Sequence, residues 1–124
     1  MSYNQEPHVK PLPGALYLSY TGLGIQHNQF KRLKQGLIAW QHTIDLHGYR
    51  VREAQAYLED KLRSIHHSGE RAVLIIHGKG HPSNGSMIKG FVQAYLKASP
   101  RVLAFCSAQP KDGGTGAVYC LLKN

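Results

Sequence analysis

The feature that most constrains the fold is the alternation of short apolar segments and amphipathic segments after residue 40. Short runs of β-branched and other apolar residues are typical of buried strands, and apolar residues spaced three or four apart are typical of helices. The alternation predicts the order βαβαββ. The expected strands lie at 42–48, 72–76, 102–106 and 117–122, and the expected helices lie at 51–69 and 86–98.

This order predicts an α/β domain, a two-layer sandwich in which the helices pack on one sheet. Strand–helix–strand connections are right-handed, so the first three strands should be parallel, and the short loop before the last strand should make that strand antiparallel. We therefore expect a mostly parallel four-stranded sheet in a domain at 41–124. Residues 1–40 are expected to form an extended arm, interrupted by Pro and Gly, followed by a short basic helix at 27–36.

The bulk composition limits the class of protein and of partner. The 124 residues carry 15 Lys and Arg against seven Asp and Glu, a formal net charge of +8, which favours a polyanion such as RNA, DNA or the ribosome. No apolar run approaches the roughly 20 residues that span a bilayer, and residues 1–10 lack the apolar segment of a secretory signal. Cys106 and Cys120 lie in apolar runs and are expected to be buried thiols. These features favour the cytoplasm.

Side chains able to carry acid–base chemistry follow the first two expected strands. Ligands bind where the C-terminal ends of parallel strands meet, so these side chains should share one basin. A carboxylate beside an imidazole can fix its tautomer, and two histidines can divide the acid and base work of phosphodiester cleavage. A lysine held between two glycines can stabilise the charge on a phosphate. The expected catalytic residues are Asp45, His47, His77 and Lys79.

Further residues are candidates for contact with a nucleic-acid backbone. Basic side chains on the short helix would meet phosphates, and glycines in two turns would let the backbone come close. The amides of the turn 78–80 would add donors of the kind found in anion nests. The candidates are Lys31, Arg32, Lys34, Arg50, Gly78, Gly80, Lys111, Gly113 and Gly114.

Each of these groups also has a structural interpretation. A histidine at a strand end is more often a hydrogen-bonded structural residue than a catalyst, an exposed basic helix face is often only solvated, and 113–116 can form a tight turn. The set Asp45, His47, His77 and His81 could bind zinc or manganese, but no HExxH or CxxC motif frames it, so we expect no resident metal. Mg²⁺ is expected only if DNA is the substrate.

Three segments together resemble the small MutS-related (Smr) domain. Ile44–Gly48 is similar to the family pattern LDLHG, His77–Gly80 to HGxG, and Gly113–Ala117 to GGxGA. The stretch Phe30–Gly36 resembles the basic helix that precedes the domain in stand-alone bacterial members. The resemblance covers roughly residues 41–122.

The resemblance implies an α/β sandwich similar to the C-terminal domain of translation initiation factor 3. It also implies an endonuclease, since family members are associated with nicking DNA and some bacterial ones with cutting mRNA at collided ribosomes. The functional motif residues of the family map to Asp45, His47 and 77–80. Arg50 stands where a helix-capping threonine is common, which would cost about 1 kcal/mol of capping and could add a phosphate contact.

The leading hypothesis is a nucleic-acid endonuclease. RNA supplies its own 2′-hydroxyl nucleophile, so a histidine base and a lysine could suffice, whereas attack of water on DNA usually requires a metal ion. The alternative is a non-catalytic module that binds nucleic acid or the ribosome through its basic surface. A third possibility is an enzyme acting on a small phosphate ester, against which the wide spread of positive charge argues mildly.

Overall fold

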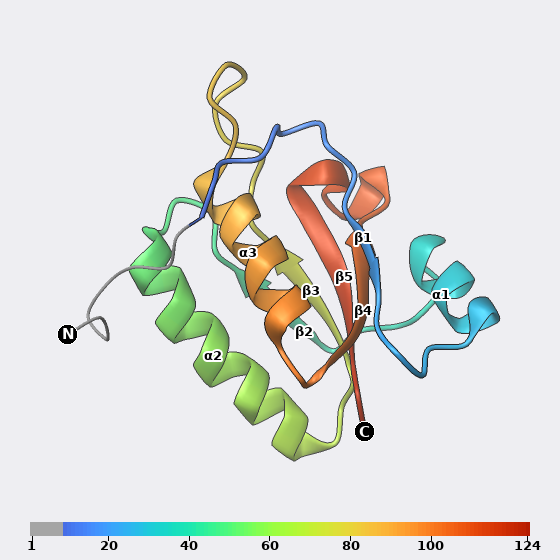
Figure 1. Ribbon diagram of the computed structural model, residues 1–124. Helices are drawn as coiled ribbons and strands as arrows, with labels where there is room; N and C mark the ends of the chain where they lie inside the picture. The colour runs from blue at the N-terminus through green and yellow to red at the C-terminus, as the bar shows by residue number, and fades with distance from the viewer. Residues whose placement is uncertain (1–8) are drawn as a thin grey trace.

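The computed structural model describes residues 9–124 (Figure 1). Residues 1–8 lie outside the described residues, and with them the beginning of the expected arm and most of the segment that is expected to lack a secretory signal. The helices are α1 (His27–Lys34), α2 (Val51–Ser68) and α3 (Met87–Ala98). The strands are β1 (Ser19–Thr21), β2 (His42–Asp45), β3 (Ala72–Ile76), β4 (Val102–Ser107) and β5 (Ala117–Leu122). The structure thus confirms the α/β class and each helix and strand that the sequence predicts.

The sheet is mixed, with the strand order β1-β4-β5-β3-β2. As expected, β2, β3 and β4 run in one direction and β5 runs against them: β2 pairs in parallel with β3, and β5 pairs antiparallel with both β3 and β4. Because β5 returns beside β4 through a short loop and separates it from β3, the β2–β3 pair is the only parallel one among residues 9–124. The expectation of four strands is wrong, because β1 pairs antiparallel with β4 and makes a fifth.

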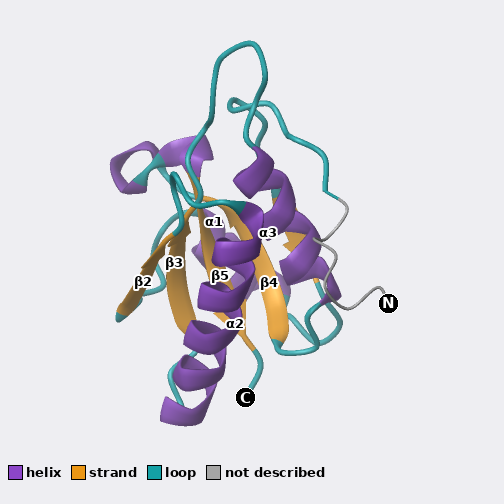
Figure 2. Cartoon of the chain, turned by 90° about the vertical axis from the view of Figure 1, so that its left-hand side faces the viewer, coloured by secondary structure: helices purple, strands orange, loops and turns teal. Residues whose placement is uncertain are grey.

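Helices cover the two faces of the sheet unequally (Figure 2). One face packs against α2 and α3, whose buried residues cluster with Val73 and Ile75, and the other packs against α1, where Leu33 clusters with Leu74 and Tyr119. This double coverage explains why β3 and β4 are continuous apolar runs. The sheet with α2 and α3 makes the expected two-layer sandwich, and α1 adds a partial third layer. In the described part of the chain, no helix is long and apolar enough to cross a membrane.

Helix α2 begins and ends where local signals in the sequence place it. Gly69 follows its last turn in the left-handed conformation, with φ of 84°, and its N–H donates to the carbonyl of His66. At the other end, the side chain of Arg50 supplies no acceptor. The carboxylate of Glu53 instead accepts the backbone N–H of Arg50 at 3.0 Å. One half of a capping box therefore takes the place of the threonine cap in the family pattern.

The described part of the N-terminal segment folds back onto the rest of the chain (Figure 1). It crosses the beginning of α3, where Leu12 and Ser86 exchange backbone hydrogen bonds of 3.1 and 2.9 Å, and then runs along β4 as β1. Leu18 is only 1% exposed, and its N–H donates to Oγ of Ser107 at 2.7 Å. The sequence did not predict β1 because a strand of three residues is too short to show alternation.

Candidate active site

An aspartate–histidine pair follows the end of β2. The Nδ1–H of His47 donates to Oδ1 of Asp45 at 2.6 Å, and the backbone N–H of His47 donates to the same oxygen at 3.1 Å. Burial alone would raise the pKa of Asp45, but the hydrogen bonds from His47 outweigh it and lower that pKa below its usual value. The carboxylate is therefore charged at neutral pH. It holds the proton of the ring on Nδ1 and leaves Nε2 of the exposed His47 for proton transfer.

His77, at the end of β3, is in a different state. Its side chain is 2% exposed, and its Nδ1–H donates to the carbonyl of Gly78 at 2.8 Å. Burial lowers the pKa of His77 to about 4; the bond to Gly78 opposes this shift and the charge of Lys89 adds to it. Its Nε2 has no hydrogen-bond partner among residues 9–124. At neutral pH His77 is an uncharged acceptor, which does not fit the expected sharing of acid and base work between two similar histidines.

Lys79 lies in a tight turn that the glycine-rich loop before β5 holds in place. The N–H of Gly78 donates to the carbonyl of Gly116 at 2.9 Å. This amide is already paired, so the expectation that it forms part of an anion nest is wrong. Gly80 has φ of 73°, and a Cβ atom there would lie 2.0 Å from the carbonyl oxygen of Gly85, so only glycine fits.

One cavity of about 480 Å³ brings together three of the four expected catalytic residues. His47, His77 and Lys79 line it, together with the beginning of α3. Asp45 is not part of the lining and acts on the cavity through its hydrogen bond to His47. The strand ends approach closely, since a Cβ atom built on Gly78 would lie 3.4 Å from the Cβ of His47. The side chains expected at the C-terminal ends of β2 and β3 therefore meet at this cavity.

A second cavity, of about 450 Å³, shares Lys79 with the first. Its other walls are Tyr17 and the loop between β4 and β5. Two of the expected contact residues, Gly113 and Gly114, line it, but their N–H groups donate to carbonyls of the same loop. These glycines therefore offer a ligand space rather than hydrogen-bond donors. Tyr17 was not expected here, because it lies in a segment without periodicity.

Lys89 of α3 is a second residue that the sequence reasoning missed. It is fully buried, and its Nζ donates to the carbonyls of Gly14, Leu16 and Thr115 at 3.0, 2.5 and 2.9 Å. Burial, followed by the charge of Lys79, lowers the pKa of Lys89 to about 8, so the group remains charged at pH 7. Lys89 therefore joins the N-terminal segment to the glycine-rich loop. A lysine within the apolar stretch that starts α3 is the signal that could have revealed it.

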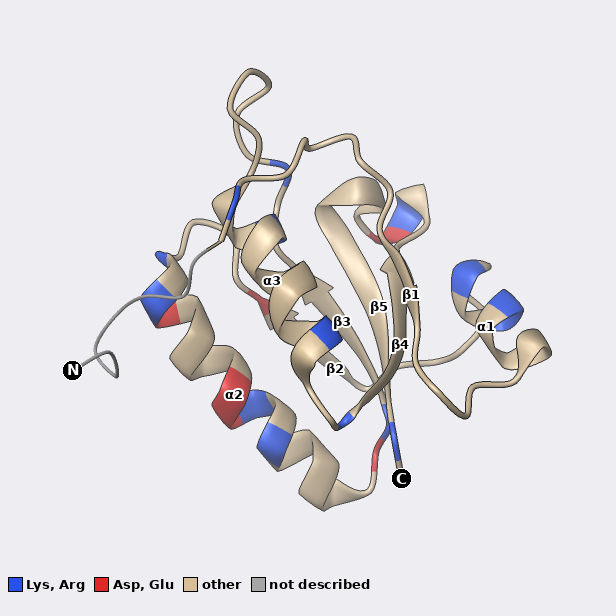
Figure 3. Ribbon diagram, viewed as in Figure 1, with Lys and Arg blue, Asp and Glu red and all other residues tan. Residues whose placement is uncertain are grey.

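The remaining expected contact residues are exposed cations outside the linings of both cavities. Figure 3 marks Lys and Arg in blue, among them positions on α1. The end of α1 adjoins the second cavity, because the carbonyl of Lys34 accepts a hydrogen bond of 2.7 Å from Nε2 of Gln109, which lines that cavity. The exposed residues are Lys31, Arg32 and Lys34 on α1, Lys111 in the 3-10 turn Pro110–Asp112, and Arg50 before α2.

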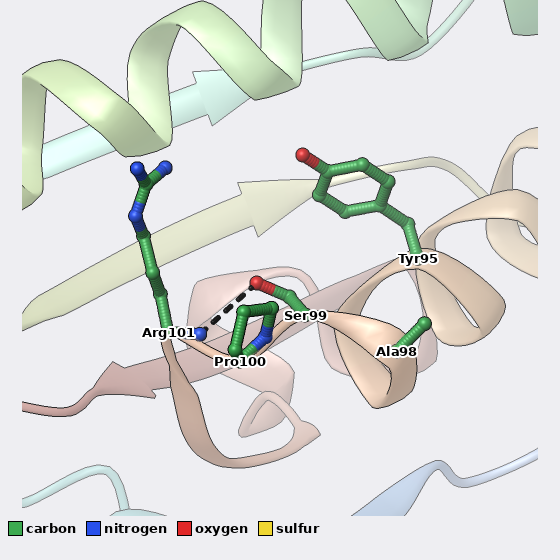
Figure 4. Close-up of a pocket in the computed structure, with 5 residues that line it drawn as sticks. All are labelled: Tyr95, Ala98, Ser99, Pro100 and Arg101. Carbon is green, nitrogen blue, oxygen red and sulfur yellow. Dashed lines mark hydrogen bonds between the residues drawn. The ribbon is translucent and has the colours of Figure 1, made fainter.

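A third cavity lies away from these residues, at the C-terminal end of α3. Figure 4 shows its lining, which consists of Tyr95, Ala98, Ser99, Pro100 and Arg101. The 12 residues of α3 span roughly 18 Å at 1.5 Å per residue, and the first cavity lies at the other end of the helix. This third cavity contains none of the expected site residues.

The side chains that could bind a metal ion were expected to hold none permanently. Within residues 9–124, no three His, Cys, Asp or Glu side chains gather closely enough to hold a metal ion. Oδ1 of Asp45 already accepts two hydrogen bonds from His47, and Nδ1 of His81 accepts the backbone N–H of Ser83. A Mg²⁺ ion at this site would need ligands from the substrate.

Comparison with known proteins agrees with the motif pattern. The sequence profile of the Smr domain matches residues 44–123. The probable DNA endonuclease SmrA of Escherichia coli (strain K12) is 31% identical over 114 residues, which cover 90% of this chain and 61% of that protein. The ribosome rescue factor SmrB of Shewanella sp. (strain ANA-3) is 27% identical over 121 residues, covering 98% of this chain and 66% of that protein. The chain thus spans less than two thirds of the length of either relative.

Solved structures show the same fold. The crystal structure of YdaL, a stand-alone small MutS-related protein from Escherichia coli, has a TM-score of 0.81 at 26% identity, covering 99% of this chain and 95% of that chain. The Smr domain of Thermus thermophilus MutS2 has a TM-score of 0.60 at 26% identity, covering 68% of this chain and 100% of that chain. Profile, motifs and fold agree, and this chain belongs to the Smr domain family.

Proposed function

We propose that this chain is a nucleic-acid endonuclease whose catalytic residues are Asp45, His47, His77 and Lys79. The observation that carries the proposal is the cavity lined by two histidines and a lysine, with Asp45 hydrogen-bonded to His47. An oriented imidazole, a neutral acceptor and an ammonium are groups that suit phosphodiester cleavage. Relatives named as a DNA endonuclease and a ribosome rescue factor support nucleic acid, free or on the ribosome, as the partner.

In this proposal His47 transfers the proton. Its Nδ1–H bond to Asp45 leaves Nε2 to take a proton from the attacking hydroxyl, and the charged carboxylate stabilises the imidazolium that forms. Lys79 binds the phosphate and offsets the negative charge that develops on it. His77 contributes a neutral ring to the lining, and its buried Nε2 is an acceptor without a partner among residues 9–124.

The two nucleic acids would give different products. In RNA, the 2′-oxygen attacks phosphorus and its proton passes to His47. The bond from phosphorus to the 5′-oxygen breaks, this oxygen takes a proton from water, and the hydroxide that remains takes the proton from His47. The products are a cyclic phosphate and a 5′-hydroxyl. DNA lacks this hydroxyl, so water must attack, and such reactions usually use a metal ion. End-group analysis therefore distinguishes the two reactions.

The proposal is tested by cleavage of single-stranded RNA and DNA of matched sequence, with and without EDTA. We expect His47→Ala and Asp45→Ala to lower the cleavage rate by about 100-fold or more while affinity is retained, because a proton-transfer group contributes that much. His67→Ala, which removes an exposed histidine of α2, is the control and should cut at the wild-type rate. Full activity in His47→Ala would contradict the proposal.

The second candidate function is a module that binds nucleic acid or the ribosome without cutting it. The net charge of +8 favours it, because binding a polyanion needs a cationic surface and no acid–base pair. A rigorously purified wild-type chain that binds both substrates and cuts neither would support this function instead.

A further inference from the structure

We propose that the second cavity binds an unpaired nucleobase, stacked on Tyr17, next to the phosphodiester that is cleaved. This inference rests on the proposed function and narrows its substrate class to single-stranded nucleic acid. The cavity is lined by Tyr17, Lys79 and residues of the loop between β4 and β5.

Tyr17 presents the aromatic surface that a base requires. Its side chain lines the cavity and is 48% exposed, although burial together with the neighbouring Cys106 raises the pKa of Tyr17 to about 12. The phenol therefore stays uncharged at neutral pH, and a substantial part of the residue remains accessible. Stacking on an aromatic ring contributes about 1–3 kcal/mol per base and tolerates any base, because every base has a π-face.

The backbone on both sides of Tyr17 is held rigidly. The carbonyl of Leu16 accepts a hydrogen bond from Nζ of Lys89, and Leu18 exchanges hydrogen bonds of 2.7 and 2.8 Å with Ser107. The same Nζ donates to the carbonyl of Thr115 on the opposite wall. One buried ammonium thus fastens both walls, so a ligand entering the cavity would lose little free energy in ordering it.

The other walls provide space and positive charge. A Cβ atom built on Gly114 would have nothing within 4 Å, so this part of the lining faces open space. Lys79 lines both cavities, and a phosphate on its ammonium would connect a nucleotide in the second cavity to one at His47 in the first. Lys111 is exposed in the same loop and adds charge complementary to a phosphate backbone.

The occupant must be an unpaired base of a polyanion. In a duplex both faces of a base are covered by its neighbours and its edge is paired, so the base cannot reach an aromatic side chain in a cavity. Lys79 in the lining and the exposed Lys111 of the neighbouring loop favour a phosphate backbone over an apolar peptide. Single-stranded DNA and RNA share the base and the phosphate, and the site does not need to distinguish them.

The experiment measures binding without cutting. A short single strand that carries the fluorescent base 2-aminopurine at each position in turn is titrated into the His47→Ala chain. We expect fluorescence quenching at one position and, with Tyr17→Leu added, loss of that quenching and about 10-fold weaker binding, since 10-fold corresponds to the lower part of the stacking range. Tyr17→Phe keeps the ring and should bind within twofold. Tyr95→Leu, in the third cavity of Figure 4, is the matched control and should change nothing.

Two further measurements keep the outcome decisive. Thermal unfolding shows that each variant is folded, and removing the base at the quenched position tests the same contact without changing the protein. Equal affinity and equal quenching in Tyr17→Leu, or an abasic strand and a full duplex that bind as tightly as the intact strand, would overturn the subsite. Quenching that depends on Tyr17, together with a wild-type chain that cuts neither RNA nor DNA, would support the subsite and reject the endonuclease.

Discussion

His47 and His77 end neighbouring strands, and their surroundings give them different chemistry. His47 is exposed and its ring is oriented by Asp45, so it can exchange protons with a substrate. Burial, reinforced by the charge of Lys89, lowers the pKa of His77 and keeps its imidazole neutral. A neutral histidine with an unpaired Nε2 can accept a hydrogen bond there and has no proton on that nitrogen to give to a leaving group.

The state of His77 predicts how stability depends on pH. Its pKa is about 4 in the folded chain and about 6.5 in the unfolded chain, so between these values only the unfolded chain binds the proton. We expect the free energy of unfolding to fall by up to about 3 kcal/mol as pH decreases from 6.5 to 4, in addition to the loss from other groups. Denaturant unfolding of wild type and His77→Gln measures the difference. The exposed control His67→Gln should retain the wild-type slope, and equal slopes in all three chains would refute the prediction.

The two elements before residue 41, β1 and α1, cover parts of the sheet that α2 and α3 leave open. Strand β1 covers the edge of β4, and α1 covers the sheet face opposite to α2 and α3. The end of α1 also adjoins the second cavity through the hydrogen bond between Lys34 and Gln109. A nucleic acid that leaves this cavity would therefore meet the exposed cations of α1.

This placement predicts the salt dependence of binding. Each phosphate contact with a single strand contributes roughly 0.7 to the slope of log affinity against log salt concentration. We expect Lys31→Ala with Arg32→Ala to weaken binding and reduce the slope by roughly 1.4, measured with the same His47→Ala background. Lys97→Ala, on the last turn of α3, should leave the slope unchanged. An unchanged slope in the double variant would remove α1 from the interface.

At the scale of the whole molecule, three segments distant in the sequence meet at one buried cation. The Nζ of Lys89 in α3 binds carbonyls of the N-terminal segment and of the loop before β5. A buried charge is tolerated only when its donors are paired, and here three carbonyl oxygens pair them. The position of Tyr17 and of the glycine-rich loop therefore depends on a residue that lines neither of the two candidate-site cavities.

Replacing this lysine should destabilise the fold. Lys89→Met keeps the length of the side chain and leaves three carbonyls without their donor, so we expect a loss of about 3 kcal/mol in the free energy of unfolding. Lys97→Met, on an exposed position of the same helix, should change it by less than about 0.5 kcal/mol. Chemical denaturation measures both. A Lys89→Met chain as stable as Lys97→Met would show that the ammonium does not hold these segments together.

Several parts of this protein followed from local sequence patterns. The spacing of the apolar residues predicted β2 to β5 and helices α1 to α3. A helix or strand that packs against any apolar surface needs apolar residues at the spacing of its own buried face. The order of strands and helices then predicted that the ends of β2 and β3 would meet, and the cavity shared by His47, His77 and Lys79 agrees. The motif residues carried the family, which the profile match at 44–123 confirms.

The strand order and the surroundings of the buried side chains could be seen only in the tertiary structure. β5 inserts between β3 and β4, and β1 pairs with β4. Both pairings depend on which strand edges have backbone N–H and C=O groups left to pair. The neutral state of His77, the buried ammonium of Lys89 and the place of Tyr17 each depend on neighbours from distant parts of the chain. A sequence pattern reports the periodicity of a segment, whereas a side chain's protonation and neighbours are set by the segments that pack around it.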